Sequence, residues 1–370
     1  MKVGFDAKRA YLNTRGLGTY SRSILESVQK YFPCNQYYLY KPKGGRQVWD
    51  DRTGFTVRDN GLTPGVYWRI FGIGSEIIKD RLDIYHGLSN ELPVFLPSKT
   101  TKNVVTIHDV IWWKHPEFYP LIDKQIYKWK TLKALANADH IIAVSENTRL
   151  DLIDLFPDAG NKISVVHPPC GEVFYRKKSA ADLQVIRKNF DLPNKFILYV
   201  GSLNRNKGVD SLIIMLSQME SSLNLVIVGE GSEKVSLFEL SKKHKVAKQV
   251  YWLNKSRNPN QIELSSIYQM AMATILPSHY EGFGLPIIES LASRTPVITA
   301  NHSSLPEAAG PGAVYIKSNN PDELSAAIET VLSDSQLYDQ LLDDGYEHAL
   351  RFKSQLKITE LMQLYEDLVS

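Results

Sequence analysis

Strand and helix patterns alternate along the whole chain, and they predict an α/β protein with two doubly wound domains. Short apolar runs rich in Val, Ile and Tyr alternate with segments of helical periodicity in both halves, as in parallel sheets covered by helices. The 370 residues also exceed what one hydrophobic core usually holds. The segment Pro168-Pro169-Cys170-Gly171 is predicted to be the interdomain linker, because proline stops regular pairing.

The first half is predicted to begin with a strand and to contain five strands in all. The stretch 35–62 is polar and is expected to be irregular. Strands are predicted at 2–7, 83–88, 103–107, 140–145 and 162–167, and helices at 20–32, 127–137 and 145–156.

The second half repeats the alternation and ends in three consecutive helices. Strands are predicted at 196–200, 225–228, 251–253, 273–276, 296–299 and 313–316. Helices are predicted at 181–189, 262–270, 287–292, 322–332, 335–349 and 354–369.

The composition is that of a soluble globular protein, with 43% hydrophobic and 22% charged residues. A net charge of +3 is too small to predict a nucleic-acid partner. Two cysteines, Cys34 and Cys170, do not suggest a disulfide framework. No apolar run reaches the ~20 residues that span a bilayer, and the N-terminus looks like a strand rather than a signal segment. We therefore expect a cytoplasmic protein, with peripheral contact at the inner face of the membrane left open.

The segment 279–289 carries the clearest functional pattern. It follows the apolar run 273–276, and Pro286 occupies a helix-starting position. The glycines of the segment therefore lie in a turn between a strand and a helix N-terminus. Such a turn presents backbone N–H groups and the positive end of the helix dipole, which favour an anion.

Two carboxylates flank this turn, with seven residues between them. Glu281 is predicted in the turn, where it can meet a ligand. Glu289 is predicted about one turn into the helix, where it can accept hydrogen bonds from hydroxyl groups. Together with the anion site, this arrangement suits a sugar linked to a diphosphate and a ribose. The alternative is a common glycine-rich turn with two solvated glutamates.

The segment resembles the Glu-x7-Glu signature of the family 4 glycosyltransferases, retaining enzymes of the GT-B class. The match continues through Pro296-Val297-Ile298 and Pro306-Glu307. The resemblance implies an α/β GT-B fold, in which two Rossmann-like domains face a cleft. It implies an acceptor-binding domain at 1–171, a nucleotide-sugar-binding domain at 172–352, and a helix at 353–370 that crosses back to the first domain.

The resemblance also implies roles for residues of the second domain. Glu281 would bind hydroxyls of the transferred sugar as a catalytic residue, and Glu289 would bind the ribose. The backbone of the turn would hold the donor diphosphate through Gly282, Phe283, Gly284 and Leu285.

Other donor contacts are predicted at two more strand ends. Lys207 would neutralise the leaving diphosphate as a catalytic residue. Asn206 stands where many family members have arginine, so Arg205 is the candidate to replace it. Leu253 is expected to hold the nucleotide base through its backbone. The alternative for the basic residues is a solvated loop.

In the first domain, the resemblance singles out a glycine loop and a histidine. Gly16 and Gly18 are predicted to lie in a turn that opens onto a helix, where backbone amides approach the donor diphosphate or the acceptor; the alternative is a simple glycine cap. His108 ends the strand 103–107 and would face the transferred sugar as a catalytic residue. The alternative is a histidine with a structural hydrogen bond. His86 is a second, weaker candidate.

The predicted activity is retaining transfer of a hexosyl group from a nucleotide-sugar, GDP-mannose or a UDP-sugar, to a saccharide or lipid-linked saccharide. The loop Arg15-Gly16-Leu17-Gly18-Thr19-Tyr20 and the end of the strand at His108 most resemble mannosyltransferases of bacterial polysaccharide pathways. The sequence has no Asp-x-Asp motif, and we expect neither a metal nor another cofactor. Three alternatives are a phosphorylase, a nucleotide-sugar epimerase of the same fold, and a non-catalytic nucleotide-sugar-binding protein.

Overall fold

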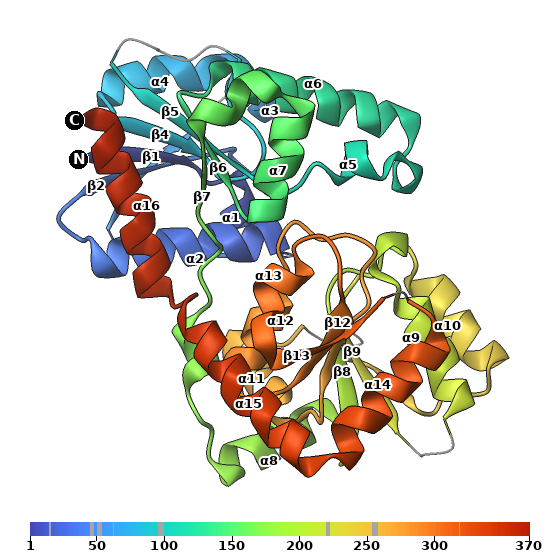
Figure 1. Ribbon diagram of the computed structural model, residues 1–370. Coiled ribbons are helices and arrows are strands. Elements are labelled where there is room, and N and C mark those ends of the chain that lie inside the picture. Colours follow the sequence, from blue (N-terminus) through green and yellow to red (C-terminus); the bar gives the residue numbers. More distant parts are fainter. Residues whose placement is uncertain are drawn as a thin grey trace. The chain divides into compact units, whose positions relative to one another are not determined.

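The protein forms two compact units in a computed structural model (Figure 1). Unit 1 comprises Met1–Pro169 and Ser354–Ser370, and unit 2 comprises Cys170–Lys353. The structure describes residues 1–14, 16–44, 48–49, 54–61, 63–94, 100–219, 223–253, 258–317 and 319–370. None of the helices in these ranges is long and apolar enough to cross a membrane.

Unit 1 is built on a parallel sheet of seven strands, in the order β3-β2-β1-β4-β5-β6-β7. The strand order reverses between β1 and β4, and such switch points are where open α/β sheets bind ligands. The strands are β1 (Lys2–Asp6), β2 (Gln36–Lys41), β3 (Phe55–Asp59), β4 (Ile84–Gly87), β5 (Lys102–Ile107), β6 (His140–Ala143) and β7 (Ile163–Val165).

Helices cover the sheet of unit 1, and the last helix of the chain belongs to this unit (Figure 1). The helices are α1 (Lys8–Leu12), α2 (Gly16–Tyr31), α3 (Gly65–Tyr67), α4 (Ile73–Asp80), α5 (Ile111–Lys114), α6 (Leu121–Asn137), α7 (Glu146–Leu155) and α16 (Ser354–Val369).

Helix α16 completes the core of unit 1. Its Ile358 and Leu361 belong to the same buried cluster as β1 and α2. Its Tyr365 hydroxyl also lies 2.5 Å from Nδ1 of the fully buried His86, whose Nε2 lies 2.8 Å from Oγ1 of Thr106. Burial lowers the pKa of His86 to about 3, so the ring is neutral. His86 therefore has a structural position in this unit.

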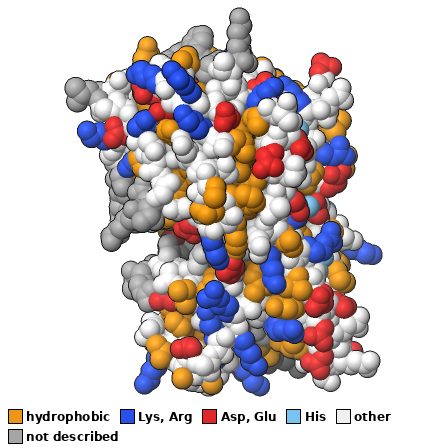
Figure 2. All heavy atoms as spheres, turned by 90° about the vertical axis from the view of Figure 1, so that its left-hand side faces the viewer, with side chains coloured by type: hydrophobic (Ala, Val, Ile, Leu, Met, Phe, Trp, Pro, Cys, Tyr) orange, Lys and Arg blue, Asp and Glu red, His pale blue; other side chains and the backbone are white. Residues whose placement is uncertain are grey.

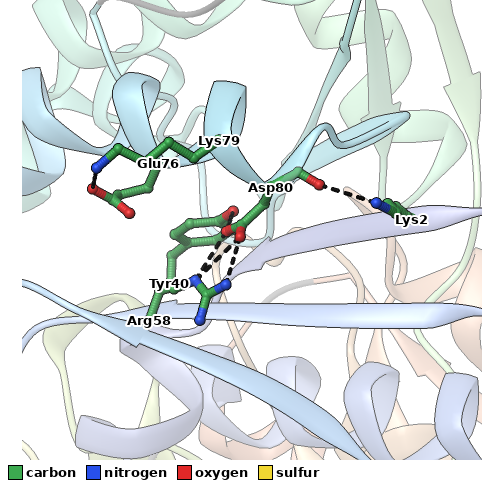
Figure 3. Close-up of polar contacts among 6 residues, drawn as sticks. All are labelled: Lys2, Tyr40, Arg58, Glu76, Lys79 and Asp80. Carbon is green, nitrogen blue, oxygen red and sulfur yellow. Dashed lines mark hydrogen bonds and ion pairs between the residues drawn. The ribbon is translucent and has the colours of Figure 1, made fainter.

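A buried carboxylate ties the outer strands of unit 1 to α4 (Figure 3). Arg58 of β3 pairs with Asp80 at the end of α4, with Nη2 2.6 Å from Oδ1. The Tyr40 hydroxyl donates to Oδ2 of the same carboxylate at 2.8 Å. Because Asp80 is buried, these contacts replace the water that its charge would otherwise require.

Two expectations for unit 1 were wrong in detail. The stretch 35–62 contains β2 and β3, because the tyrosines of β2 are buried or half-buried in the sheet although the stretch as a whole is polar. Helix α2 begins at Gly16, so Gly16 and Gly18 lie in its first turn rather than in a turn before it.

Unit 2 is built on a parallel sheet of six strands, in the order β10-β9-β8-β11-β12-β13. The order reverses between β8 and β11. The strands are β8 (Phe196–Val200), β9 (Asn224–Val228), β10 (Val250–Trp252), β11 (Thr274–Leu276), β12 (Val297–Ala300) and β13 (Ala313–Ile316).

Helices flank this second sheet as well (Figure 1). They are α8 (Ala180–Phe190), α9 (Val209–Gln218), α10 (Lys234–Lys243), α11 (Gln261–Met270), α12 (Leu285–Ala292), α13 (Leu305–Ala309), α14 (Pro321–Ser333) and α15 (Ser335–Leu350). Two parallel sheets with helices confirm the predicted fold class.

Candidate functional site

The loops after β8 and β11 meet at the switch point of the unit 2 sheet. The loop after β8 carries Lys207 in a short 3-10 helix (Arg205–Lys207), and the loop after β11 carries Glu281. Nζ of Lys207 lies 2.7 Å from Oε1 of Glu281, and the two side chains are only 16% and 18% exposed. The structure thus brings together two predicted catalytic residues that are far apart in the sequence.

Hydroxyl groups hold Glu281 and its loop in place. Ser278 donates from Oγ to Oε1 of Glu281 at 2.8 Å. Ser304 donates from Oγ to the carbonyl oxygens of Glu281 and Phe283, at 2.9 and 3.0 Å. The backbone N–H of Glu281 donates to Oγ of Ser303 at 3.3 Å. The carboxylate is therefore fixed before any ligand binds.

Gly208 lets the two loops approach each other. Its φ of +64° is unfavourable for residues with a side chain, and a Cβ there would lie 2.3 Å from the carbonyl oxygen of Pro277. Two residues further along that loop, His279 donates its backbone N–H to the carbonyl oxygen of Asn206 at 2.9 Å. Close backbone contact thus positions Lys207 against Glu281.

Helix α12 begins directly after the loop of Glu281. Gly284 precedes it with φ +110°, and the helix starts at Leu285 with proline next. Its N-terminal N–H groups and dipole give a positive potential beside the ion pair. Phe283 is buried and packs against Phe352, with ring centroids 5.5 Å apart, so the turn is anchored to the core.

Glu289 lies within α12 and is only 6% exposed. The Tyr268 hydroxyl donates to its Oε2 at 2.9 Å. Its other oxygen, Oε1, has no hydrogen-bond partner among the described residues. This atom is not fully buried, so part of it remains accessible to solvent. Burial raises the pKa of Glu289 to about 7, although the Tyr268 hydrogen bond opposes this shift. Burial, with a further contribution from Glu289, also raises the pKa of the Cys170 thiol.

The remaining residues that were predicted to contact the donor differ in exposure. Arg205 is exposed and has no ion pair among the described residues, whereas Lys207 points to Glu281. Leu253 is buried at the end of β10. Gly282 is half-buried in the turn before α12.

In unit 1, His108 follows β5 with its ring oriented by neighbours. Its Nε2 lies 2.9 Å from the carbonyl oxygen of Leu88, so Nε2 carries the proton and Nδ1 has the lone pair. The ring packs edge-on to Tyr20, with centroids 4.6 Å apart. Burial lowers the pKa of His108 to about 4. His108 is therefore a neutral imidazole whose Nδ1 can accept a hydrogen bond from a hydroxyl group.

The two predicted glycines of α2 differ in their surroundings. A Cβ on Gly18 would lie 1.8 Å from the carbonyl oxygen of Asn13, so this glycine allows close backbone contact. That carbonyl oxygen also accepts from Nη1 of Arg22 at 2.8 Å. A Cβ on Gly16 would meet nothing within 4 Å, which leaves open space beside the helix start. Arg15 lies outside the described residues.

Comparison with known protein families assigns the chain to a family. Residues 183–348 match "Glycosyl transferases group 1", and residues 40–170 match "Glycosyltransferase Family 4". The chain belongs to the family 4 glycosyltransferases. The prediction made from the Glu281 and Glu289 spacing is confirmed at the level of the family.

The curated relatives of this glycosyltransferase are enzymes of the same kind. An O-antigen chain mannosyltransferase B of Escherichia coli is 28% identical over 289 residues, which are 76% of this chain and 74% of the relative. A D-inositol 3-phosphate glycosyltransferase of Corynebacterium aurimucosum is 29% identical over 247 residues, 63% of this chain and 58% of the relative. The chain therefore spans less than two thirds of this second relative.

Solved structures show the same fold over the whole glycosyltransferase. A sucrose-phosphate synthase from Thermosynechococcus elongatus has a TM-score of 0.80 at 18% identity, covering 100% of this chain and 99% of that one. A glycosyltransferase from Rickettsia africae has a TM-score of 0.76 at 17% identity, covering 100% and 98%. The fold is GT-B.

Sequence reasoning did not find the residues that position the glutamates of this glycosyltransferase. Tyr268, the partner of Glu289, comes from α11 and has no signal in the sequence. Ser278 stands three residues before Glu281, and Ser304 stands two residues before the matching pair Pro306-Glu307. Within the described ranges, no group of three or more His, Cys, Asp or Glu side chains could hold a metal ion.

Proposed function

We propose that this glycosyltransferase moves a hexosyl group from a nucleotide-sugar to a saccharide or lipid-linked saccharide, with retention of anomeric configuration and without a metal. The observation that carries the proposal is the pair Lys207 and Glu281, set beside the N-terminus of α12 at the switch point of a parallel sheet. A cation, a helix dipole and a fixed carboxylate suit a diphosphate joined to a sugar.

In this proposal, donor binding rearranges the ion pair. The diphosphate takes the Lys207 ammonium as its counter-ion, with Arg205 as a second cation from the same short helix. Glu281, held by Ser278, then accepts hydrogen bonds from hydroxyls of the sugar. Glu289 accepts from the ribose through Oε1. In unit 1, Nδ1 of His108 accepts from a sugar hydroxyl.

The transfer step follows the same reasoning. The bond between the anomeric carbon and the donor phosphate oxygen breaks, and the diphosphate leaves with the bonding electrons. The acceptor hydroxyl oxygen forms the new bond on the same face, and its proton goes to a phosphate oxygen of the leaving diphosphate. Lys207 and the first turn of α12 stabilise the negative charge that develops on that group. Glu281 binds and orients the sugar and forms no covalent bond.

For donor and acceptor, the relatives favour mannose and a bacterial polysaccharide. One of them is named an O-antigen chain mannosyltransferase of Escherichia coli, and another is named a serotype-specific mannosyltransferase of the same species. We therefore put GDP-mannose first among donors and UDP-sugars second. A growing polysaccharide on a lipid would be reached at the inner face of the membrane, so the proposal includes a peripheral membrane contact by a cytoplasmic enzyme.

A metal-free thermal shift panel of nucleotides and nucleotide-sugars tests the donor site. A ligand that binds only the folded protein, present at a hundredfold excess over its Kd, should stabilise it by ~2.7 kcal/mol. We expect a shift with GDP or with UDP compounds, but not with both. If no nucleotide raises the Tm of the well-folded enzyme, the donor assignment is wrong.

Product analysis separates transfer from the other activities of this fold. With donor and acceptor, the proposal predicts free nucleoside diphosphate and an acceptor glycoside of unchanged anomeric configuration, seen by proton NMR. Nucleotide release without acceptor, together with inversion at C2 of the sugar, would identify an epimerase. Binding of donor without any product would identify a non-catalytic binding protein.

A further inference from the structure

A series of buried hydrogen bonds in unit 1 runs from helix α16 to the neighbourhood of His108. The Tyr365 hydroxyl lies 2.5 Å from Nδ1 of His86, and Nε2 of His86 lies 2.8 Å from Oγ1 of Thr106. The same Oγ1 lies 3.2 Å from the Tyr20 hydroxyl. The Tyr20 ring in turn packs edge-on to the His108 ring, with centroids 4.6 Å apart. Residues near the two ends of the sequence are thus linked to one candidate catalytic residue.

The four members of this hydrogen-bond series are Tyr365, His86, Thr106 and Tyr20. Tyr20 is 4% exposed, and the other three are fully buried. Burial raises the pKa of Tyr20 to about 12 and lowers that of His86 to about 3, so both stay neutral near neutral pH. On the face shown in Figure 2, basic, acidic and apolar side chains are intermixed. The hydrogen-bond series is a feature of the interior, where polar groups that satisfy one another fix a single arrangement.

The loop after β4 supplies a second set of contacts to His108. Nε2 of His108 donates to the carbonyl oxygen of Leu88 at 2.9 Å, and its backbone N–H donates to Oδ1 of Asn90 at 2.7 Å. Asn90 has a φ of +59°, which is unfavourable for a residue with a side chain. Its backbone N–H donates to the carbonyl oxygen of Thr106 at 2.9 Å. These contacts leave Nδ1 of His108 as the ring nitrogen that can meet a ligand.

We infer that Tyr20 is a positioning residue for His108. The other members of the hydrogen-bond series hold Tyr20 in place from α16. A hydroxyl fixed at the far end of the Tyr20 ring prevents this ring from tilting away from His108. Because the members of the series are buried, they act on the sugar through His108 and not by direct contact. A misplacement of about 1 Å in a catalytic site can cost about 10²-fold in rate. The inference rests on the role proposed above for His108.

The alternative is that the series only satisfies buried polar groups and stabilises the core. Removal of one hydroxyl would then lower stability and leave the turnover of the folded enzyme unchanged. Tyr37 offers a matched control, because it is buried in the same core. Its hydroxyl donates to the carbonyl oxygens of Phe32 and Val28, at 2.8 and 3.2 Å, and not to a member of the series.

Single hydroxyl deletions that keep the ring test the inference by turnover. Tyr20→Phe and Tyr365→Phe should each lower kcat about tenfold with GDP-mannose or UDP-glucose, whichever the enzyme uses. The Kd of the nucleoside diphosphate, which lacks the sugar, should stay the same. Tyr37→Phe should lower the Tm as the test variants do and should change kcat less than about twofold. Equal kcat values in the test variants and Tyr37→Phe, at a temperature where all are folded, would overturn the inference.

Thr106 allows a second pair of matched variants. Thr106→Ser keeps the hydroxyl and should have the kcat of the wild type. Thr106→Val has nearly the same shape but no hydroxyl, and it should lower kcat as Tyr20→Phe does. A kcat for Thr106→Val equal to that of Thr106→Ser would contradict the inference.

The orientation of His108 can be measured without substrate, by NMR of isotope-labelled histidine rings. We expect one set of His108 signals in the wild type, with the proton on Nε2 that donates to Leu88. Tyr20→Phe and Tyr365→Phe should show a second tautomer or exchange broadening, and Tyr37→Phe should show the wild-type signals. Unchanged His108 signals in both test variants would refute the positioning role.

A double-mutant cycle with His108→Ala separates the possible failures. If the series acts through His108, adding Tyr365→Phe to His108→Ala should lower kcat by less than about twofold more. A full further loss of about tenfold would mean that the series acts elsewhere, and the inference would be wrong. If His108→Ala itself leaves kcat unchanged, the role proposed for His108 is wrong. If His108→Ala lowers kcat and the test variants do not, only the positioning inference fails.

Discussion

Glu289→Gln isolates the energetic effect of burying a carboxyl group in the donor site. The substitution keeps the shape of the side chain and an oxygen that can accept from the Tyr268 hydroxyl. It removes the titration of a group whose pKa burial raises to about 7. In its ionised form the Glu289 side chain therefore destabilises the folded protein, and a ligand that binds the carboxylate would offset this effect.

The sign of the pH effect follows from the two pKa values. In the folded protein Glu289 keeps its proton up to pH about 7, whereas its ordinary pKa is 4.5. The folded state thus binds more protons between these values, and stability falls as pH rises from 4.5 to 7. At about 1.4 kcal/mol per unit of pKa, the total is on the order of 3 kcal/mol. Glu289→Gln lacks this loss, so it should be the more stable protein at pH 8.

Chemical denaturation of wild type and Glu289→Gln from pH 5 to pH 8 measures this difference. We expect the variant to be the more stable protein by less than about 1 kcal/mol at pH 5 and by up to about 3 kcal/mol at pH 8. Glu239→Gln on the surface of α10 is the control and should follow the wild type. Donor affinity should fall 10- to 100-fold in Glu289→Gln, because a charged acceptor is lost. Parallel curves would refute the buried-charge argument, and unchanged donor affinity would refute the ribose role.

Three other substitutions test the site and the fold. Lys207→Met should lower kcat/KM by about 10²-fold or more, because the leaving diphosphate loses its cation. A pre-steady-state assay in which the rate of the transfer step equals that of the wild type would contradict this. Gly208→Ala should destabilise the protein by about 1–2 kcal/mol or more and lower its Tm, because φ is positive there, whereas Gly160→Ala should be tolerated. Asp80→Ala should cost about 1–3 kcal/mol in urea denaturation, since it leaves the buried Tyr40 hydroxyl without its acceptor, whereas Arg58 is 38% exposed and can be solvated. A loss below about 1 kcal/mol would mean that water solvates that position.

Strong periodicity made most of the fold predictable from the sequence. The strands at Phe196–Val200 and Ala313–Ile316 and the helix at Ser354–Val369 were predicted with the bounds that the structure has. Of the two missed strands, β3 is the edge strand, and it is mostly exposed, so its sequence has no apolar run. Strand β2 pairs with both β1 and β3, and it was missed because tyrosines rather than aliphatic residues supply most of its buried positions.

The site was predicted as separate motifs, and only the structure joins them. The ion pair of Lys207 and Glu281 depends on β8 and β11 being neighbours, which no local pattern reports. The burial of Glu289 likewise depends on Tyr268, a residue of another helix. Helix α6 was predicted only from residue 127, whereas it begins at Leu121 directly after Pro120.

Calorimetric titration of GDP and UDP into metal-free wild type and Lys207→Met tests whether Lys207 holds the donor diphosphate. We expect one nucleotide to bind the wild type and Lys207→Met to weaken this binding at least tenfold, while circular dichroism shows an unchanged fold. Equal affinity of the two proteins, or no binding of either nucleotide to the wild type, would contradict a diphosphate site built on Lys207 and Glu281.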